Sequence, residues 1–322
     1  MVIVFFGTPQ FAVPPLEALI HSRHRVAAVV SQPDRPKGRG QQLQPTPTKL
    51  VAEAHRIAAL QPAKIREAAF LDRIRALEPD LGVVVAFGRI LPDALIAIPR
   101  LGMINVHASI LPRYRGAAPI QRAVIAGDTE TGVTIMRIET ELDAGPTFAM
   151  KEAPIPPDAT SGQVEATLAT LGAQILLPVV DAMEGGTSRE TPQDHARATF
   201  APKVTKEEGP IDWSQPASVI HNRVRGLQPW PLASTSLDGR RYVIRRSAAP
   251  PIGTTGDSAD VAGGVVGDPG RVLRARGDEL IVACGDGSAL QILEIQPEGK
   301  RTMTTREFLA GRSVAEGKRF GA

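Results

Sequence analysis

The stretch LGVVVAFGRILPDALIAIPRLGMINVHASILPRYRG, residues 81–116, contains the two strand patterns that decide the fold. Residues 81–86 and 103–106 are short, mostly apolar runs rich in β-branched side chains. Similar runs occur at 2–6, 26–31 and 132–138, and helical patterns lie between them, for example at 63–78. Strands that are apolar on both faces and alternate with helices are typical of a mostly parallel sheet covered on both sides. The sequence therefore predicts a doubly wound, Rossmann-like α/β domain, which binds ligands at the carboxyl ends of its strands.

Length and composition are typical of a soluble protein with two domains. The chain has 322 residues, 43% of them hydrophobic, and we find no apolar run near the ~20 residues that a membrane span needs. Its start, MVIVFFGTPQ, has no basic leader and is interpreted as a first strand. The single cysteine, Cys284, excludes a disulfide within the chain, and no metal-ligand spacing is found. We therefore expect a cytoplasmic protein without a metal or a membrane anchor.

A long helix and a polar segment divide the chain. Thr160 and Gln163 form a capping-box pattern, and the apolar stripe that follows predicts a helix over 160–184. The polar, aperiodic residues after it predict a linker at 189–207. The first domain would then span 1–188 and the second 208–322.

The second domain has short alternating strand patterns separated by Gly-Asp turns. These runs lie at 241–247, 271–276, 279–284 and 289–295, after a short helical pattern at 216–227. They are typical of a small antiparallel barrel, the class that includes OB-like barrels. The stretch 249–270 is interpreted as a loop, and Thr304 with Glu307 predicts the start of a last helix.

Candidate catalytic side chains follow the strand at 103–106. Asn105 and His107 alternate with Val106, so on an extended backbone they point to the same side. An amide can donate a hydrogen bond to a developing oxyanion, and an imidazole can exchange a proton near neutral pH. Asp143 lies on a glycine-bearing loop after the next strand, where its carboxylate could reach His107 and orient it. Asn, His and Asp on neighbouring loops are typical parts of a site for acyl transfer.

Two segments nearby could hold a flat, amphipathic ligand. One places a hydroxyl and a rigid proline around an apolar pair, namely Ser109, Ile110, Leu111 and Pro112. The other is an aromatic-glycine corner followed by aliphatic residues, namely Phe87, Gly88, Ile90 and Leu91. A core strand and its turn explain the second segment equally well. No G-x-G-x-x-G or Walker pattern is present, which argues against a nucleotide cofactor.

Basic residues gather in two parts of the chain. Residues 34–49 carry Arg35, Lys37, Arg39 and Lys49 against Asp34 alone, and residues 195–246 carry nine Lys or Arg against four acids. Together the clusters could bind a polyanion, although either alone would fit an ordinary solvated surface. The first cluster lies among glycines and prolines, so we expect a segment that is mobile when free and ordered by phosphates.

Eight segments resemble those of the folate-dependent formyltransferases, in particular the members that act on charged initiator tRNA. They are, in chain order, FFGTPQFA, QPDRPKGRG, VVVAFGRILP, NVHASILPRYRGAAPIQ, TGVTIM, LDAG, KEEGPIDW and PWP. The pattern H-x-S-x-L-P-x-x-x-G, here His107 to Gly116, is specific to the superfamily, and QPDRPKGRG is more specific to the tRNA-dependent members. The resemblance covers nearly the whole chain.

The resemblance implies a reaction, its substrates and its site residues. The formyl donor would be 10-formyltetrahydrofolate, and the acceptor would be the α-amino group of methionine on initiator tRNA, with no obligate protein partner. Asn105, His107 and Asp143 match the family's catalytic residues, and Ser109 to Pro112 match its tetrahydrofolate-binding segment. Arg39 and Lys206 match residues near the tRNA. Pro146 departs from the family, which more often has an acid there, so no role is expected for that neighbouring acid.

Three other functions are open from the sequence. A formyltransferase acting on an amino-sugar nucleotide would share the Asn, His, Asp and folate donor, but it gives no reason for the basic segment 34–49. A glycinamide-ribonucleotide formyltransferase would end near the predicted linker. A nucleic-acid-binding module with an inactive first domain would not need Asn105, His107 and Asp143 intact.

Overall fold

The computed structural model describes residues 1–37, 42–249 and 267–321. Arg39 and most of the predicted loop 249–270 therefore lie outside the described residues. The chain divides into two compact units, and each is described by itself. The first comprises Met1–Ile120, Glu130–Pro154 and Val164–Pro202, and the second Gln121–Thr129, Ile155–Gln163 and Lys203–Ala322.

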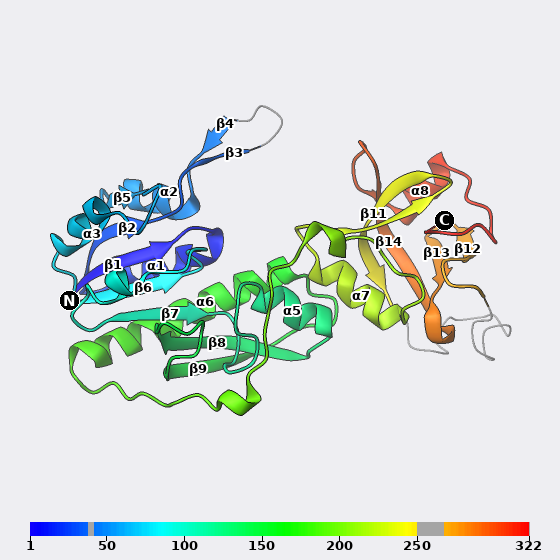
Figure 1. Cartoon of the computed structure of the whole chain (residues 1–322). Coiled ribbons are helices and arrows are strands. Elements are labelled where there is room, and N and C mark those ends of the chain that lie inside the picture. Colours follow the sequence, from blue (N-terminus) through cyan, green and yellow to red (C-terminus); the bar gives the residue numbers. More distant parts are fainter. Residues whose placement is uncertain (38–41, 250–266, 322) are drawn as a thin grey trace. The chain divides into compact units, whose positions relative to one another are not determined.

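The first unit is built on a seven-stranded sheet with the order β5-β2-β1-β6-β7-β8-β9 (Figure 1). The strands are β1 (Val2–Gly7), β2 (Arg25–Val30), β5 (Ala58–Leu60), β6 (Leu81–Val85), β7 (Met103–His107), β8 (Glu130–Arg137) and β9 (Thr147–Pro154). The five strands from β5 to β7 run parallel, whereas β8 and β9 are antiparallel to their neighbours. The predicted mostly parallel α/β sheet is confirmed, and β5 and β9 are strands that the sequence analysis did not identify.

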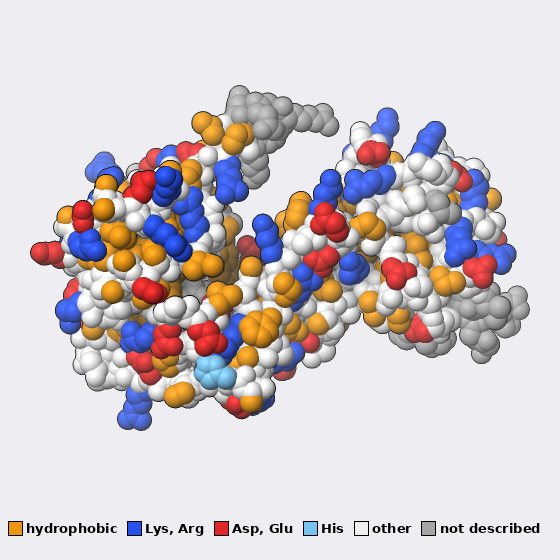
Figure 2. Space-filling view, in the orientation of Figure 1, with side chains coloured by type: hydrophobic (Ala, Val, Ile, Leu, Met, Phe, Trp, Pro, Cys, Tyr) orange, Lys and Arg blue, Asp and Glu red, His pale blue; other side chains and the backbone are white. Residues whose placement is uncertain are grey.

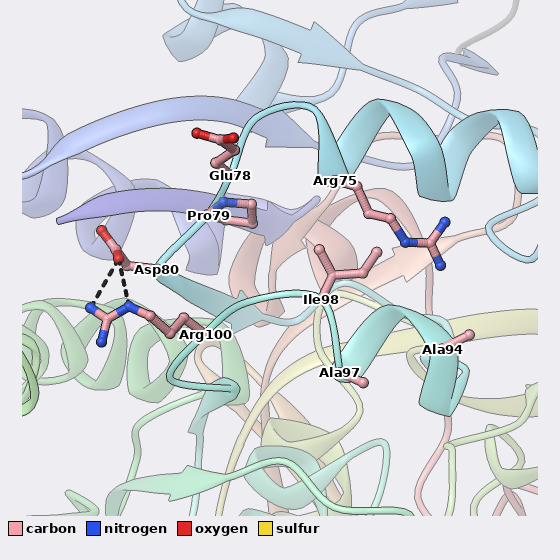
Figure 3. Close-up of a pocket in the computed structure, with 8 residues that line it drawn as sticks. All are labelled: Arg75, Glu78, Pro79, Asp80, Ala94, Ala97, Ile98 and Arg100. Atoms are coloured by element: carbon pink, nitrogen blue, oxygen red, sulfur yellow. Dashed lines mark hydrogen bonds and ion pairs between the residues drawn. The ribbon is translucent and has the colours of Figure 1, made fainter.

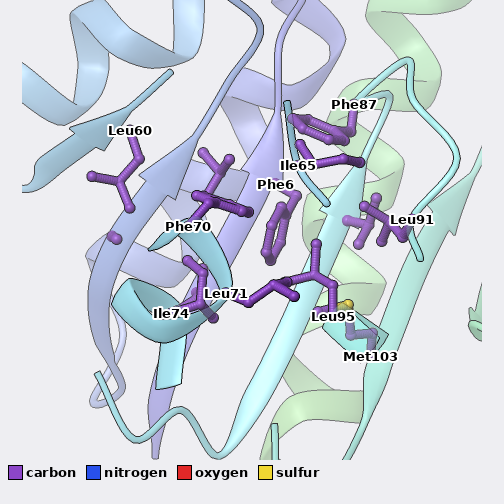
Figure 4. Close-up of a cluster of buried hydrophobic side chains, with 14 residues drawn as sticks. Phe6, Leu60, Ile65, Phe70, Leu71, Ile74, Phe87, Leu91, Leu95 and Met103 are labelled. Atoms are coloured by element: carbon purple, nitrogen blue, oxygen red, sulfur yellow. The ribbon is translucent and has the colours of Figure 1, made fainter. Parts of the chain in front are cut away.

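One face of this sheet is covered by α3 (Ala68–Arg75) and α4 (Asp93–Ile96). Phe70 and Ile74 from α3 and Leu95 from α4 pack with Phe6 of β1 and Met103 of β7 in a buried cluster (Figure 4). The helix predicted at 63–78 is shorter because Glu67 has an extended backbone and Glu78 a positive φ. Ile65 still belongs to the cluster, although it precedes the helix.

The other face of β7 and β8 is covered by α6 (Ser161–Glu184). Gly172 lies so close to the sheet that a Cβ there would be 2.8 Å from Val106 Cγ1 and 3.6 Å from Val133 Cγ1. At its start, the Gln163 backbone N–H donates to the Thr160 hydroxyl at 3.4 Å, as the capping pattern predicts. Contrary to our expectation, α6 is long and apolar enough to cross a membrane. Its buried Leu168, Leu176 and Val180 identify it as a core helix of the domain instead.

The remaining helices and strands of this half are short. They are η1 (Gln10–Ala12), α1 (Val13–Ile20), α2 (Pro47–Ala54) and η2 (His195–Arg197), whereas α5 (Pro119–Ala126) belongs mostly to the second unit. Between β2 and α2 the described ends of the basic segment form a hairpin of β3 (Arg35–Lys37) and β4 (Gln42–Gln44), with Arg35 paired to Gln44. The sequence analysis expected no regular structure there.

The second unit contains an antiparallel sheet with the order β10-β11-β14-β13-β12, and β15 pairs with β14. Its elements are η3 (Lys206–Glu208), α7 (Ala217–Gly226), β10 (Ala233–Leu237), β11 (Arg240–Ala248), β12 (Val272–Arg276), β13 (Glu279–Ala283), η4 (Gly285–Gly287), β14 (Ala289–Pro297), β15 (Met303–Thr304) and α8 (Thr305–Gly311). The core includes Tyr242, whose ring meets Phe308 and Phe320 edge-on. The antiparallel sheet and the capping box of Thr304 and Glu307 are confirmed.

Residues 190–201, which the sequence analysis assigned to a linker, are bound to the first unit. Thr191 forms a backbone bridge with Thr147 of β9, and Phe200 forms one with Arg115. The Arg137 guanidinium of β8 also donates to the Glu190 carboxylate at 2.9 Å. Residues 190–201 thus lie along the first unit, bound to it by backbone and side-chain contacts.

Gly172→Ala should destabilise the first unit by about 1–3 kcal/mol, because the added methyl group overlaps Val106 and pushes β7 away from α6. Gly162→Ala is the matched control, since its nearest atom is 4.0 Å away and the change is neutral or stabilising by up to about 1 kcal/mol. Urea denaturation of both variants measures the difference. Equal unfolding midpoints for the two would contradict the tight contact.

Candidate active site

The site begins where the apolar face of β7 becomes polar. Met103 lies in the cluster under α3 and α4, and Asn105 and His107 follow it on the same face because side chains alternate along a strand. Val106 points the other way, toward Gly172 of α6. His107 is 5% exposed and Asn105 is half-buried. Among the described residues, none forms a hydrogen bond with the Asn105 side chain, so its amide can meet a ligand.

The His107 ring is oriented by a backbone carbonyl. Its Nε2 lies 3.0 Å from the Tyr114 carbonyl oxygen, which can only accept, so Nε2 carries a proton and donates it. Nδ1 lies 3.8 Å from Asp143 Oδ2. That separation is too long for a direct hydrogen bond but short enough for charge attraction. Nδ1 is therefore the ring nitrogen that faces the carboxylate.

Asp143 approaches His107 by a route that the sequence analysis did not foresee. Because β8 runs antiparallel to β7, the loop after β8 starts near the amino end of β7, where Ile104 pairs with Arg137. The loop then folds back, and Asp143 Oδ2 accepts a hydrogen bond from the Gly116 backbone N–H at 2.8 Å. Asp143 has a positive φ of 51°, a backbone conformation that Asp tolerates better than most residues.

Two buried polar side chains near Asp143 were not singled out from the sequence. Arg115 is 2% exposed and Gln193 is 8% exposed. Arg115 lies inside the pattern from His107 to Gly116 that the sequence analysis singled out, so its position offered a signal. Gln193 offered none, because it lies in the polar, aperiodic segment that the sequence analysis assigned to a linker.

The segment from Ser109 to Pro112 is held by hydrogen bonds to Arg113 and Thr134. The Ser109 hydroxyl is buried and donates to the Arg113 carbonyl at 2.6 Å. The sequence analysis had expected this hydroxyl to lie beside a ligand. The Thr134 hydroxyl accepts from the Leu111 backbone N–H and donates to the Ser109 carbonyl. Leu111 is buried, whereas Ile110 and Pro112 are half-buried and available at the surface.

The corner at 87–91 divides between the core and the surface. Phe87 is 2% exposed and its ring meets Phe6 edge-on, and Leu91 is buried in the same cluster. Gly88 has a φ of 77°, and the Gln32 side chain holds the corner by donating to the Phe87 carbonyl at 3.0 Å. Ile90 is 79% exposed and is the aliphatic side chain here that can contact a ligand.

The predicted basic contacts are only partly described. The Arg35 side chain is exposed and donates to Gln32 Oε1 at 2.7 Å, while Lys37 ends β3. Asp34 accepts from Lys49 Nζ at 2.6 Å and Gln61 Nε2 at 2.7 Å, which anchors the base of the hairpin. Lys206 is exposed at the start of η3, in the second unit. Figure 2 shows basic and acidic side chains intermixed over the visible face of each unit.

Two other polar places in the first unit lie away from this site. One is an open hollow before the amino end of β6, lined by Arg75, Glu78, Pro79, Asp80, Ala94, Ala97, Ile98 and Arg100 (Figure 3). Asp80 is already paired with Arg100 there. The other is a trio of His24, Asp181 and Glu184 whose ligand atoms lie within 4.8 Å of one another. Arg23 already bridges its two carboxylates. His24 and Asp80 directly precede β2 and β6, so both places lie at the amino ends of the parallel strands, whereas His107 lies at the carboxyl end of β7.

Comparison with known proteins identifies the family. A family model described as "Formyl transferase" matches residues 1–180, and one described as "Formyl transferase, C-terminal domain" matches residues 203–313. A methionyl-tRNA formyltransferase from Pelobacter propionicus is 48% identical over 319 residues, covering 99% of this chain and 96% of its own. One from Methylococcus capsulatus is 46% identical over 321 residues, covering all of both chains.

The chain belongs to the methionyl-tRNA formyltransferase family. It is thus an enzyme that transfers formyl groups. The crystal structure of WlaRD, a sugar 3N-formyl transferase determined with dTDP and 5-N-formyl-THF, has the same fold, with a TM-score of 0.66 at 17% identity. That match covers 94% of this chain and 99% of WlaRD. In this methionyl-tRNA formyltransferase family member, Asn105, His107 and Asp143 thus lie on a formyltransferase fold.

The anchor of the hairpin should depend on pH. The hydrogen bond from Lys49, followed by that from Gln61, holds the pKa of the Asp34 carboxyl below its usual range. A depressed folded-state pKa contributes stability above the unfolded value of about 3.9, and this contribution is lost as the pH falls through the folded value. Asp34→Asn should therefore lower the Tm at pH 7, with a gap from the unsubstituted protein that narrows below about pH 4. Thermal melts across this range test the sign, and an equal gap at pH 3 and pH 7 would contradict it.

Proposed function

We propose that this chain transfers the formyl group of 10-formyltetrahydrofolate to the α-amino group of methionine on initiator tRNA. The likeness to methionyl-tRNA formyltransferases over the whole chain carries this proposal. The geometry supports it, because the Asn105 amide, which has no hydrogen-bond partner among the described residues, stands two positions before His107, whose ring lies 3.8 Å from the Asp143 carboxylate. The product, N-formylmethionyl-tRNA, would serve translation initiation in the cytoplasm.

Each of the three side chains has a distinct role in the proposed reaction. The neutral amine attacks the formyl carbon and forms the new carbon–nitrogen bond. The Asn105 amide and protonated His107 Nδ1 hold the oxyanion that develops on the formyl oxygen. Asp143 orients His107 and assists removal of the amine proton. The bond to the folate nitrogen then breaks, and that nitrogen leaves with a proton, so no enzyme-bound formyl group is needed.

The formyl donor would lie against the two segments beside β7. Ile90, Ile110 and Pro112 supply exposed or half-buried apolar contacts for its ring system. Ser109, Leu111, Phe87 and Leu91 would act indirectly, because their buried side chains fix the backbone of these segments. Gly88 would let the backbone approach the ligand closely. The formylated tetrahydrofolate with which WlaRD was crystallised supports this class of donor.

The tRNA would be bound by Arg35, Lys37 and Arg39 of the basic segment 34–49 and by Lys206. Guanidinium and ammonium groups on glycine-rich or exposed segments suit phosphate contacts, which position a nucleic acid without reading its sequence. No metal or protein partner is needed for this proposal.

We also propose the domain division 1–188, 189–207 and 208–322, with an OB-like barrel in the last part. The described sheet has β10 and β12 at its ends, but the C-terminal residues lie between them. The Val272 N–H donates to the Lys318 carbonyl at 2.7 Å and the Gly321 N–H donates to the Ser236 carbonyl at 2.9 Å. These bonds support a closed barrel.

Replacing Asn105, His107 or Asp143 with Ala should each lower kcat by about 100-fold or more, because a donor or a proton acceptor at the reacting carbon is lost. Transfer of labelled formyl groups to charged initiator tRNA measures this, and circular dichroism checks the fold. Near-normal turnover of Asn105→Ala would contradict its oxyanion role. The same assay with an amino-sugar nucleotide tests the alternative acceptor, and efficient transfer to it in place of tRNA would overturn the proposed function.

Arg39→Ala should lower kcat/KM for tRNA. It should also reduce the slope of log kcat/KM against log salt concentration, by the amount expected for about one lost phosphate contact. Slow hydrolysis of the folate donor, which needs no tRNA, should stay unchanged. Measuring kcat/KM for tRNA from about 50 to 200 mM salt gives the slope. Loss of both activities would point to damage of the fold, and an unchanged slope would contradict the contact.

A further inference from the structure

The residues from Tyr114 to Gly116 orient both titratable side chains of the site. The Tyr114 carbonyl accepts from His107 Nε2, and the Gly116 N–H donates to Asp143 Oδ2. Tyr114 and Gly116 both have a positive φ, of 62° and 122°. This unusual backbone aims a carbonyl and an N–H from residues two apart at the two catalytic groups, so a small shift of the segment would misplace both.

Arg115, between them, is held by a fork of hydrogen bonds. Its Nε and Nη2 both donate to Gln193 Oε1, at 3.2 and 2.9 Å. Nη2 also lies 3.2 Å from His195 Nδ1, and Nη1 lies 3.4 Å from Glu141 Oε1. The guanidinium is 2% exposed, so these partners are needed to offset the cost of burying its charge.

Gln193 joins this arginine to the Asp143 loop. Its Nε2 donates to the Asp143 carbonyl at 2.9 Å and to the Gly145 carbonyl at 2.7 Å. One amide thus accepts from the segment that orients His107 and donates to the backbone on both sides of Ala144. The backbone of Arg115 also binds the segment 190–201. The Arg115 N–H donates to the Thr199 carbonyl, and the Ala201 N–H donates to the Arg115 carbonyl.

We propose that Gln193 and Arg115 are positioning residues, which set the approach of the Asp143 carboxylate to His107 from the segment 190–201. Neither side chain is assigned contact with a substrate. Their role is to hold Asp143 in a left-handed backbone that the loop alone would not favour. This inference rests on the proposed catalytic role of Asp143.

Gln193→Glu separates the bonds that Gln193 accepts from Arg115 from those that it donates to the Asp143 loop. A carboxylate still accepts from Arg115, with a stronger charge-assisted bond, but it cannot donate to the two carbonyls of the loop. The variant keeps the buried arginine paired, but it replaces the two donated bonds with repulsion between a carboxylate oxygen and the two carbonyls, so the restraint on Asp143 is lost. Gln193→Ala removes both sets of bonds, and Glu190→Ala is the matched control, because Glu190 lies on the same segment but pairs with Arg137.

The decisive experiment is a double-mutant cycle with Asp143→Ala, using formyl transfer to charged initiator tRNA by the full chain. We expect Gln193→Glu to lower kcat about 10-fold or more in the unsubstituted background, with KM for both substrates within about twofold. In the Asp143→Ala background it should have almost no effect, because a residue that acts through Asp143 has nothing left to position. Glu190→Ala should leave kcat near normal in both backgrounds.

Three results would count against the inference. An equal loss of kcat in both backgrounds would show that Gln193 acts independently of Asp143. A raised KM with unchanged kcat would assign it to binding, and a parallel loss for Glu190→Ala would indicate general damage to the segment. If Asp143→Ala alone kept full turnover, the proposed role of Asp143 would itself fail, which is a separate result read from a single variant.

Discussion

The packing of β7 between two apolar layers is the constraint on which the site depends. Met103 is fixed in the cluster under α3 and α4, and Val106 is fixed against Gly172 of α6. With both faces of the strand held, the side chains that follow at alternate positions cannot rotate away or exchange faces. Asn105 and His107 therefore emerge where the apolar cover ends, and the hydrophobic core determines the direction of these two polar groups.

Much of the fold could be predicted because buried strands have a simple signature. The runs at 2–6, 26–31, 81–86 and 103–106 are apolar on both faces, and each became a strand of the parallel sheet. The strand at 132–138 was also found, but its antiparallel direction was not, since side-chain pattern carries no information on direction. The expected proximity of Asp143 to His107 therefore rested on an incomplete argument. The loop after β8 must first fold back to Gly116 before Asp143 comes near His107.

The parts that could not be predicted depend on contacts between distant polar residues. Gln193 lies 50 residues from the Asp143 carbonyl that it binds, in a stretch without periodicity. The burial of Phe87 and Leu91, and the internal use of the Ser109 hydroxyl, likewise depend on neighbours from other elements. Residue type suggested a ligand contact at each of these positions, whereas tertiary packing decided which side chains face inward. Ile90 could be separated from its neighbours only once the cluster was known.

In the proposed mechanism, the left-handed backbone of Asp143 favours activity at the expense of stability at one position. A non-glycine residue in this conformation costs about 1 kcal/mol or more, which glycine would recover. Stabilising changes selected without regard to activity would therefore be found at a residue to which the proposed mechanism gives a catalytic role. A lineage released from the need to formylate would be expected to lose this carboxylate early, through drift toward a more relaxed loop.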